Sequence, residues 1–183
     1  MLTLHRVRAV RLTEDGAELA GHAVVVSGDR IAAVGPVEEL LAAYGETART
    51  REWDGVLAPG RYEPDAPALL EGAYWPDPRE ADALGAEPLT GAVLDALEMT
   101  DTRWGGSARR GVQRLLASGV TEVSGPFARP EVRRAVERSG VRVVPGPHRR
   151  ELTPGGPADF TVHDEAGVCL VTALGGRLVH RRR

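Results

Sequence analysis

Two stretches of short apolar runs and turn signals stand at the beginning and at the end of the sequence. The first extends from Leu2 to Pro36, and the second extends from Ala158 to Val179. Each stretch predicts only a few short strands, and a small isolated group of strands is at best marginally stable in water. Neither stretch buries two faces alone, so the two ends of the chain are expected to join in one β structure.

The first stretch predicts a hairpin followed by a helix. Residues 22–27 form an apolar run, Gly28 begins a turn signal, and residues 30–34 form a second run. Short apolar runs on both sides of such a turn are typical of a β-hairpin. Residues 37–44 then place apolar side chains at helical spacing, and Gly45 is expected to end that helix.

The middle of the chain alternates helix and strand signals. A helical face that ends at Gly119 is followed by a strand at residues 120–124, a helix that begins at Pro130, and a strand at residues 141–144. This order predicts a βαβ unit with parallel strands and a right-handed crossover. Residues 64–90 are rich in proline and acidic side chains, and there we expect an irregular crossing over the surface.

Composition excludes several kinds of chemistry. All 23 basic residues are arginines, so no lysine is present to form a Schiff base, to serve a phosphate-binding loop, or to ligate metal as a carbamate. The single cysteine, Cys169, has no partner for a disulfide or a zinc site and is expected to be a small buried side chain.

Charge and hydropathy bear on partners and location. The net charge of -3 gives no general attraction to nucleic acid or to an anionic membrane, so neither is expected as a partner. The sequence has no apolar run long enough to span a bilayer and no leading apolar segment typical of a signal peptide. A cytoplasmic protein is the expectation.

Four segments, in this order along the chain, resemble the amidohydrolase superfamily, particularly its imidazolonepropionase-like and dihydroorotase-like branches. The first segment is similar to the opening strands of that family. The second segment is similar to the entry of that family into the barrel. The third is similar to the segment before the second barrel strand, and the fourth to the closing strands. The segments are VVVSGDRIAAVGP at residues 24–36, VLAPG at 56–60, LLASGVTEV at 115–123, and PGGPADFTV at 154–162 with GGRLV at 175–179.

The resemblance implies a metal site whose ligands this sequence lacks. In the family, the Pro-Gly entrance precedes a His-x-His pair at the mouth of a (β/α)₈ barrel, and here those two positions are Asp65 and Pro67. Proline offers no donor atom to a metal. A full barrel needs about 250 residues, so the strands that carry the later family ligands, a lysine, two histidines and an aspartate, do not fit between the two β-rich ends. We expect no metal and no cofactor.

The predicted fold is therefore mixed α/β. Residues 1–58 with 154–183 are expected to form a small composite β sheet or sandwich, and residues 59–153 a truncated barrel remnant of two or three parallel strands. The open edges of such a remnant need a cover. Residues 64–100 or a second copy of the chain would provide it, which makes a homodimer an expected partner.

Candidate site residues follow the three middle strands, because parallel α/β folds present ligands at the carboxyl ends of their strands. Glu63 and His148 are the candidate acid–base pair. Surface ion pairing of the acidic cluster and a solvated loop position for His148 are the alternatives. The candidate ligand-binding residues are Arg61, Tyr62, Asp65 and Ser124.

Two functions from different classes remain open. The first is a degenerate, non-catalytic amidohydrolase-like protein that binds a small metabolite or a partner protein at the former barrel mouth. The second is an enzyme, either a metal-free acid–base catalyst using Glu63 and His148 or an imidazolonepropionase-like hydrolase of C–N bonds in cyclic amides. Family resemblance supports hydrolysis, but a fold does not by itself imply a function.

Overall fold

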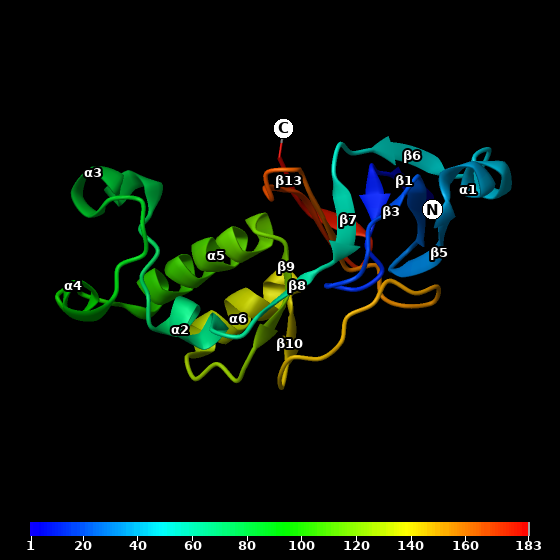
Figure 1. The fold of residues 1–183 in the computed structure, drawn as a ribbon. Coiled ribbons are helices and arrows are strands. Elements are labelled where there is room, and N and C mark those ends of the chain that lie inside the picture. Colours follow the sequence, from blue (N-terminus) through cyan, green and yellow to red (C-terminus); the bar gives the residue numbers. More distant parts are fainter. Residues whose placement is uncertain (183) are drawn as a thin grey trace. The chain divides into compact units, whose positions relative to one another are not determined.

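The computed structural model describes residues 1–182, which divide into two compact units. Unit 1 is built from three segments of the chain: residues 1–61, residues 116–121, and the segment that starts at residue 148. Unit 2 consists of residues 62–115 and 122–147. Figure 1 shows the fold coloured along the sequence, with most of the elements labelled.

Unit 1 contains two sheets and one helix, α1 (Val37–Tyr44). The first sheet has the order β5-β4-β1-β6, and its strands are β1 (Leu2–Arg6), β4 (His22–Ser27), β5 (Arg30–Pro36) and β6 (Arg49–Glu52). The second has the order β13-β12-β11-β7-β2-β3, and its strands are β2 (Ala9–Val10), β3 (Leu19–Ala20), β7 (Val56–Pro59), β11 (Phe160–His163), β12 (Cys169–Leu174) and β13 (Arg177–Arg181).

The predicted hairpin and the predicted helix after it are both confirmed. Strands β4 and β5 pair antiparallel, and the pair Ser27 and Arg30 closes the turn. Gly28 has φ +60°, a left-handed conformation that glycine adopts without a steric penalty. Helix α1 begins directly after β5, and its buried Leu40 faces the sheet.

The two chain ends form one β structure, as the sequence predicts. Strand β11 pairs antiparallel with β7, and β7 pairs parallel with β2, so the late strands and the early strands share the six-stranded sheet. The strand that carries the Pro-Gly entrance is thus the centre of this sheet.

The sheets of unit 1 pack face to face around an aliphatic core, which confirms the predicted sandwich. Its buried members come from both sheets, and each large apolar side chain removed from water contributes roughly 1.5–3 kcal/mol. They include Val24, Val26 and Ile31 from the four-stranded sheet and Leu57, Phe160, Val162 and Val171 from the six-stranded sheet. Helix α1 covers the other face of the four-stranded sheet, over Leu4, Ala23 and Val25.

A three-stranded sheet of order β10-β9-β8 contributes most of its residues to unit 2. Its strands are β8 (Arg61–Glu63), β9 (Val120–Ser124) and β10 (Arg142–Val144). Strands β9 and β10 pair parallel, with Glu122 opposite Arg142, and helix α6 (Pro130–Ser139) connects them. The predicted βαβ unit is confirmed, and β10 leaves Val143 half exposed at the edge of the sheet.

The expected irregular crossing at residues 64–90 is partly wrong, because three short helices interrupt it. They are α2 (Ala66–Glu71), the 3₁₀ turn η1 (Pro78–Glu80) and α3 (Ala81–Leu84). Pro67 and Pro78 lie in the first turns of α2 and η1, where the missing N–H has no helical partner to lose. Asp77 and Glu80 also form a capping box that starts η1.

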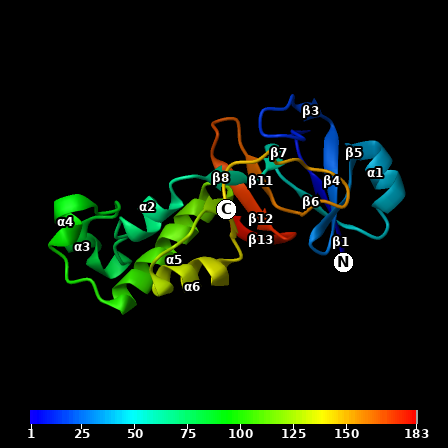
Figure 2. The ribbon, with the colours of Figure 1, turned by 90° about the horizontal axis from the view of Figure 1, so that it is seen from below.

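Two more helices complete unit 2, α4 (Gly91–Asp95) and α5 (Asp101–Ala117). Helix α5 ends close to the Gly119 expected from the sequence, and Gly105 and Gly106 lie within it. Helices α5 and α6 run side by side (Figures 1 and 2), and the Arg129 guanidinium lies 4.1 Å from the Trp104 ring centroid. Within residues 1–182, no helix has the length and apolar character required to cross a membrane.

Candidate functional site

The family's first two metal-ligand positions lie at the start of helix α2. Asp65 is the residue before the helix, and Pro67 lies in its first turn. Across residues 1–182, no three His, Cys, Asp or Glu side chains gather in an arrangement suited to a metal ion. The residues present therefore do not fit the metal centre that the family resemblance implies.

The sequence-predicted site residues fall in both units. Tyr62, Glu63, Asp65 and Ser124 belong to unit 2, whereas Arg61 and His148 belong to unit 1. Glu63 Oε1 accepts a hydrogen bond of 3.0 Å from the Asp65 backbone N–H, and Ser124 Oγ donates one of 2.5 Å to the Pro64 carbonyl. Two of the candidates thus have local structural roles, and the proposed Glu63 and His148 pair stays a prediction.

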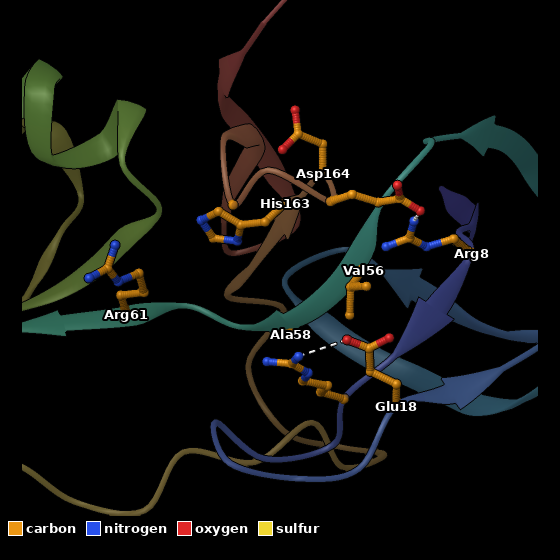
Figure 3. A pocket seen from close by; sticks show the side chains of 10 residues that line it. Arg8, Glu18, Val56, Ala58, Arg61, His163 and Asp164 are labelled. Carbon is orange, nitrogen blue, oxygen red and sulfur yellow. Dashed lines mark hydrogen bonds and ion pairs between the residues drawn. The ribbon is translucent and has the colours of Figure 1, made fainter.

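A cavity of about 380 Å³ lies in unit 1 and gathers charged side chains from distant parts of the sequence (Figure 3). This volume is within the range of small-molecule sites, about 300–1,000 Å³. The lining residues are Arg8, Arg11, Glu18, Val56, Ala58, Arg61, His163, Asp164, Glu165 and Gly167. Of the predicted site residues, Arg61 alone lines this cavity.

The register of β7 and β11 explains why the cavity forms on this side of the sheet. Val56 pairs with His163, and directly opposed residues of antiparallel strands point to the same face. The neighbouring Leu57 and Val162 point the other way and belong to the core of the sandwich. The cavity therefore opens on the outer face of the six-stranded sheet.

The short segment of residues 116–121 packs on this outer face and bounds the space around His163. Thr172 Oγ1 donates a hydrogen bond of 2.5 Å to the Leu116 carbonyl, which fixes the segment to β12. Gly119 has φ +91°, and a Cβ there would lie 2.7 Å from Thr161 Oγ1 and 3.1 Å from the His163 ring. Glycine is therefore required where this segment passes the imidazole.

Most charges of the cavity are paired with one another. Arg8 donates to Glu165, and Arg11 Nη2 donates to Glu18 Oε1 over 2.7 Å. Asp164 Oδ1 accepts a hydrogen bond of 2.8 Å from the backbone N–H of Val168. These contacts hold the rim in shape and use much of its hydrogen-bonding capacity.

Arg61 differs from the other arginines of the cavity. Its side chain is exposed, and its Nη1 donates one long hydrogen bond of 3.4 Å to the Ser118 carbonyl. No carboxylate of residues 1–182 forms an ion pair with it. A guanidinium presents five N–H donors in a planar fork that matches a carboxylate. Arg61 therefore supplies free donors and positive charge at the cavity.

The surroundings of His163 favour its neutral form. Burial lowers the pKa of His163 below its ordinary value, a hydrogen bond with the Ser118 backbone opposes this, and the positive charge of Arg61 lowers it further. A neutral imidazole has one donor nitrogen and one acceptor nitrogen. Figure 3 shows the ring on the side of the cavity that faces Arg61, so a ligand held by Arg61 meets an uncharged hydrogen-bonding group.

His163, Arg11 and Asp164 line the cavity but are not among the site residues predicted from the sequence. The one local signal is a His-Asp pair at the end of an apolar strand, at residues 163–164. The other residues that line the cavity come mainly from residues 8–18 and 56–61. Only the pairing of strands in the sheet brings these segments close to His163 and Asp164.

Comparisons with known proteins bear on the fold. Residues 23–46 match the model of the imidazolonepropionase-like composite domain, bacteria. No curated protein sequence matches the chain.

Among solved structures, the chain is similar to ochratoxinase from A. niger, with 20% identity, a TM-score of 0.52, and coverage of 78% of this chain and 30% of that one. It is also similar to a zinc-bound adenosine deaminase from Xanthomonas campestris, with 19% identity, a TM-score of 0.52, and coverage of 78% and 33%. A triazine hydrolase variant gives 20% identity, a TM-score of 0.53, and coverage of 78% and 34%.

These relatives are amidohydrolase superfamily members, and the chain spans about a third of their length. The identity is low, so the similarity concerns the fold. Together with the sandwich built from both chain ends and the three-stranded sheet, it confirms the predicted resemblance: the chain has the fold of part of an amidohydrolase, with an imidazolonepropionase-like composite segment at residues 23–46.

Proposed function

We propose that the chain binds a small carboxylate-bearing metabolite in the unit 1 cavity and does not hydrolyse it. One observation carries the proposal: the Arg61 guanidinium, which has no carboxylate partner among residues 1–182, lies at a cavity of about 380 Å³ beside the neutral imidazole of His163. Arginine fits a carboxylate through two parallel hydrogen bonds, which gives both affinity and orientation.

The other contacts of the cavity support a preformed site. The Arg8 and Glu165 pair and the Arg11 and Glu18 pair fix two sides of it, so little side-chain entropy is lost when a ligand enters. Val56 and Ala58 give the floor an apolar strip on β7. A ligand with a short apolar body and a carboxylate at one end fits this distribution of groups.

Isothermal titration calorimetry with succinate and N-acetylglycine as probes tests this proposal. Arg61→Gln removes the charge and is expected to weaken binding at least about tenfold, the loss of one charge-assisted hydrogen bond of about 1.5–3 kcal/mol. Arg177→Gln is the matched control, because Arg177 is exposed in unit 1 and does not line the cavity. Equal affinity of the wild type and Arg61→Gln for both probes would overturn the assignment.

Hydrolysis of C–N bonds in cyclic amides is the second candidate, and the hydrolase-family fold is the observation that favours it. Under this candidate, purified protein turns over a cyclic amide, and Glu63→Gln abolishes turnover with little change in Tm. Glu63 also accepts a hydrogen bond from the Asp65 backbone, so a large loss of stability in Glu63→Gln would instead assign it a structural role.

A homodimer remains a proposal as well. Strand β10 is an edge strand with a half-exposed Val143, and edge strands without a partner or cover are sites of association. Sedimentation equilibrium over a wide concentration range tests it directly. Monomers at every concentration would leave the edge covered by the chain itself.

A further inference from the structure

A second cavity, of about 340 Å³, lies within unit 2 and has no part in the function proposed above. Its walls come from the 3₁₀ turn η1 and from one side of helix α5. The lining residues are Tyr74, Asp77, Arg79, Glu80, Thr102, Arg103, Gly106, Arg109 and Arg110. Four arginines and two carboxylates give this lining a formal charge of +2.

Two of these arginines are fixed by protein contacts. Arg103 donates to Glu80 Oε1 over 2.8 Å and to the Glu98 carbonyl over 2.9 Å. Arg110 Nε donates to the Trp75 carbonyl over 2.8 Å, and its Nη1 lies 3.3 Å from Asp77 Oδ2. Their contacts neutralise both carboxylates of the lining and hold the guanidinium planes in place.

Arg109 has no such contact. Its side chain is exposed, and among residues 1–182 it makes no hydrogen bond and no ion pair. The positive charge that remains after the internal pairs are formed is therefore located at Arg109 and at Arg79, which lies on η1 across the cavity. Two net positive charges match one dianion.

The guanidinium groups of Arg109 and Arg110 lie close to Gly106, which has no side chain to crowd them. A Cβ built at this position would lie 3.3 Å from Arg110 Nη1, 3.7 Å from Arg110 Nη2 and 3.9 Å from Arg109 Nη2. Glycine within a helix costs about 1 kcal/mol relative to alanine. Gly106 is in the interior of α5 and does not have a positive φ, so no turn geometry requires glycine here.

We propose that this cavity binds a phosphate group, either as free phosphate or as a small phosphate monoester, over Gly106. Phosphate is dianionic near neutral pH, and arginine binds its oxygens through paired hydrogen bonds. Arg109 provides the unpaired charge, Arg110 provides a second guanidinium held in position, and the absence of a side chain at Gly106 leaves these groups uncrowded on the helix side. Tyr74 and its ring contact with Arg103, 4.9 Å to the centroid, give the cavity a fixed wall.

The test is calorimetric titration with inorganic phosphate and with phenyl phosphate on four variants of the full chain. Gly106→Ala and Arg109→Gln are expected to weaken binding at least about tenfold. Gly105→Ala is the control for helix propensity, because a Cβ there would lie 3.7 Å from Glu131 Cβ, an ordinary contact. Arg114→Gln is the control for net charge, because Arg114 is exposed on the same helix and does not line this cavity.

The stability of the two alanine variants sharpens the result. Gly105→Ala is expected to be as stable as the wild type or slightly more stable in thermal unfolding, because it removes a helical glycine. In Gly106→Ala the same gain is offset by the shift that the new Cβ imposes on Arg110 Nη1, 3.3 Å away. Lost binding in Gly106→Ala with undiminished Tm then reports the site and not the fold. Tighter binding of phenyl phosphate than of phosphate indicates a monoester, and equal binding indicates free phosphate.

Three results would overturn the proposal. They are the absence of binding of either probe to the wild type, unchanged affinity in Gly106→Ala and Arg109→Gln, and an equal loss of affinity in Arg114→Gln. The last result would mean that the helix attracts anions only through its general charge.

Discussion

The buried polar side chains of unit 1 and unit 2 differ in charge. The fully buried polar groups of unit 1 are neutral: His5, Thr121, Thr161 and Thr172. In unit 2 the buried polar groups include a carboxylate, Glu122, which accepts a hydrogen bond of 2.5 Å from Arg142. Buried charge requires a partner and its removal is costly, so the core of unit 1 depends on apolar packing, and the core of unit 2 depends in addition on an arginine contact.

The largest expected effect concerns the apolar core of unit 1. Phe160 is fully buried between the two sheets, and Phe160→Ala is expected to lower the free energy of unfolding by about 3–5 kcal/mol, through lost burial and the cavity left behind. Urea unfolding followed by circular dichroism measures it. A cost smaller than that of removing Arg142 would break the comparison between the units.

Acid should weaken unit 1 through His5. Burial, with a smaller contribution from Arg51, lowers the pKa of His5 to about 4, whereas the unfolded chain has a pKa near 6.5. The unfolded state therefore binds the proton first, and stability present above pH 6.5 is lost as the pH falls toward 4, by about 3 kcal/mol in total.

The control is His5→Asn, which keeps a polar group near the Trp53 Nε1 donor, 3.1 Å from His5 Nδ1 in the wild type. Chemical unfolding of both proteins at several values between pH 7.5 and 4 gives the difference. Carboxylates titrate in both proteins, so the same pH dependence in the variant would show that His5 does not carry the effect.

The buried carboxylate of unit 2 gives the third prediction. Arg142→Ala removes a partner of Glu122 and is expected to cost about 2 kcal/mol, less than for a fully buried pair because the Arg142 side chain is 45% exposed. Adding Glu122→Gln to this variant should recover part of the loss, since an amide is less costly to bury than a charge. No recovery in urea unfolding would argue against charge as the cause.

The smallest expected effect is at the surface of unit 1. Arg6 and Glu52 form an ion pair of 2.6 Å in which the side chains are 46% and 67% exposed. Arg6→Ala is expected to change the free energy of unfolding by no more than about 0.5 kcal/mol, because water and salt screen such pairs. A loss above 1.5 kcal/mol in urea unfolding would place an important charged contact in the unit assigned to apolar packing.

Local features of the fold were predictable because their signals are local. The hairpin over residues 22–36, helix α1, strand β9 and the start of α6 at Pro130 follow from apolar runs, turn residues and helical spacing. The start of α5 at Asp101 has no comparable local signal, because Gly105 and Gly106, residues of low helix propensity, lie within the helix. In the structure, tertiary packing outweighs that low propensity.

The candidate sites were far less predictable. Arg61 was identified from its place after the Pro-Gly entrance, but His163 and the rim arginines meet it only through pairing of strands far apart in sequence. The unit 2 cavity depends on which side of α5 faces η1. Neither the register of distant strands nor the rotation of a helix about its axis is determined by any single stretch of residues.

The division of unit 1 among three chain segments has a consequence for synthesis. Strand β7 pairs with β11, which is synthesised about 100 residues later. At roughly 5–20 residues per second, this separation corresponds to a delay of about 5–20 s. During that time β7 has an open edge in the nascent chain. All residues of unit 2, by contrast, have been synthesised once residue 147 has been added. The β sandwich is thus the last part to be completed, and a chaperone that shields residues 56–59 would act on it before any ligand can.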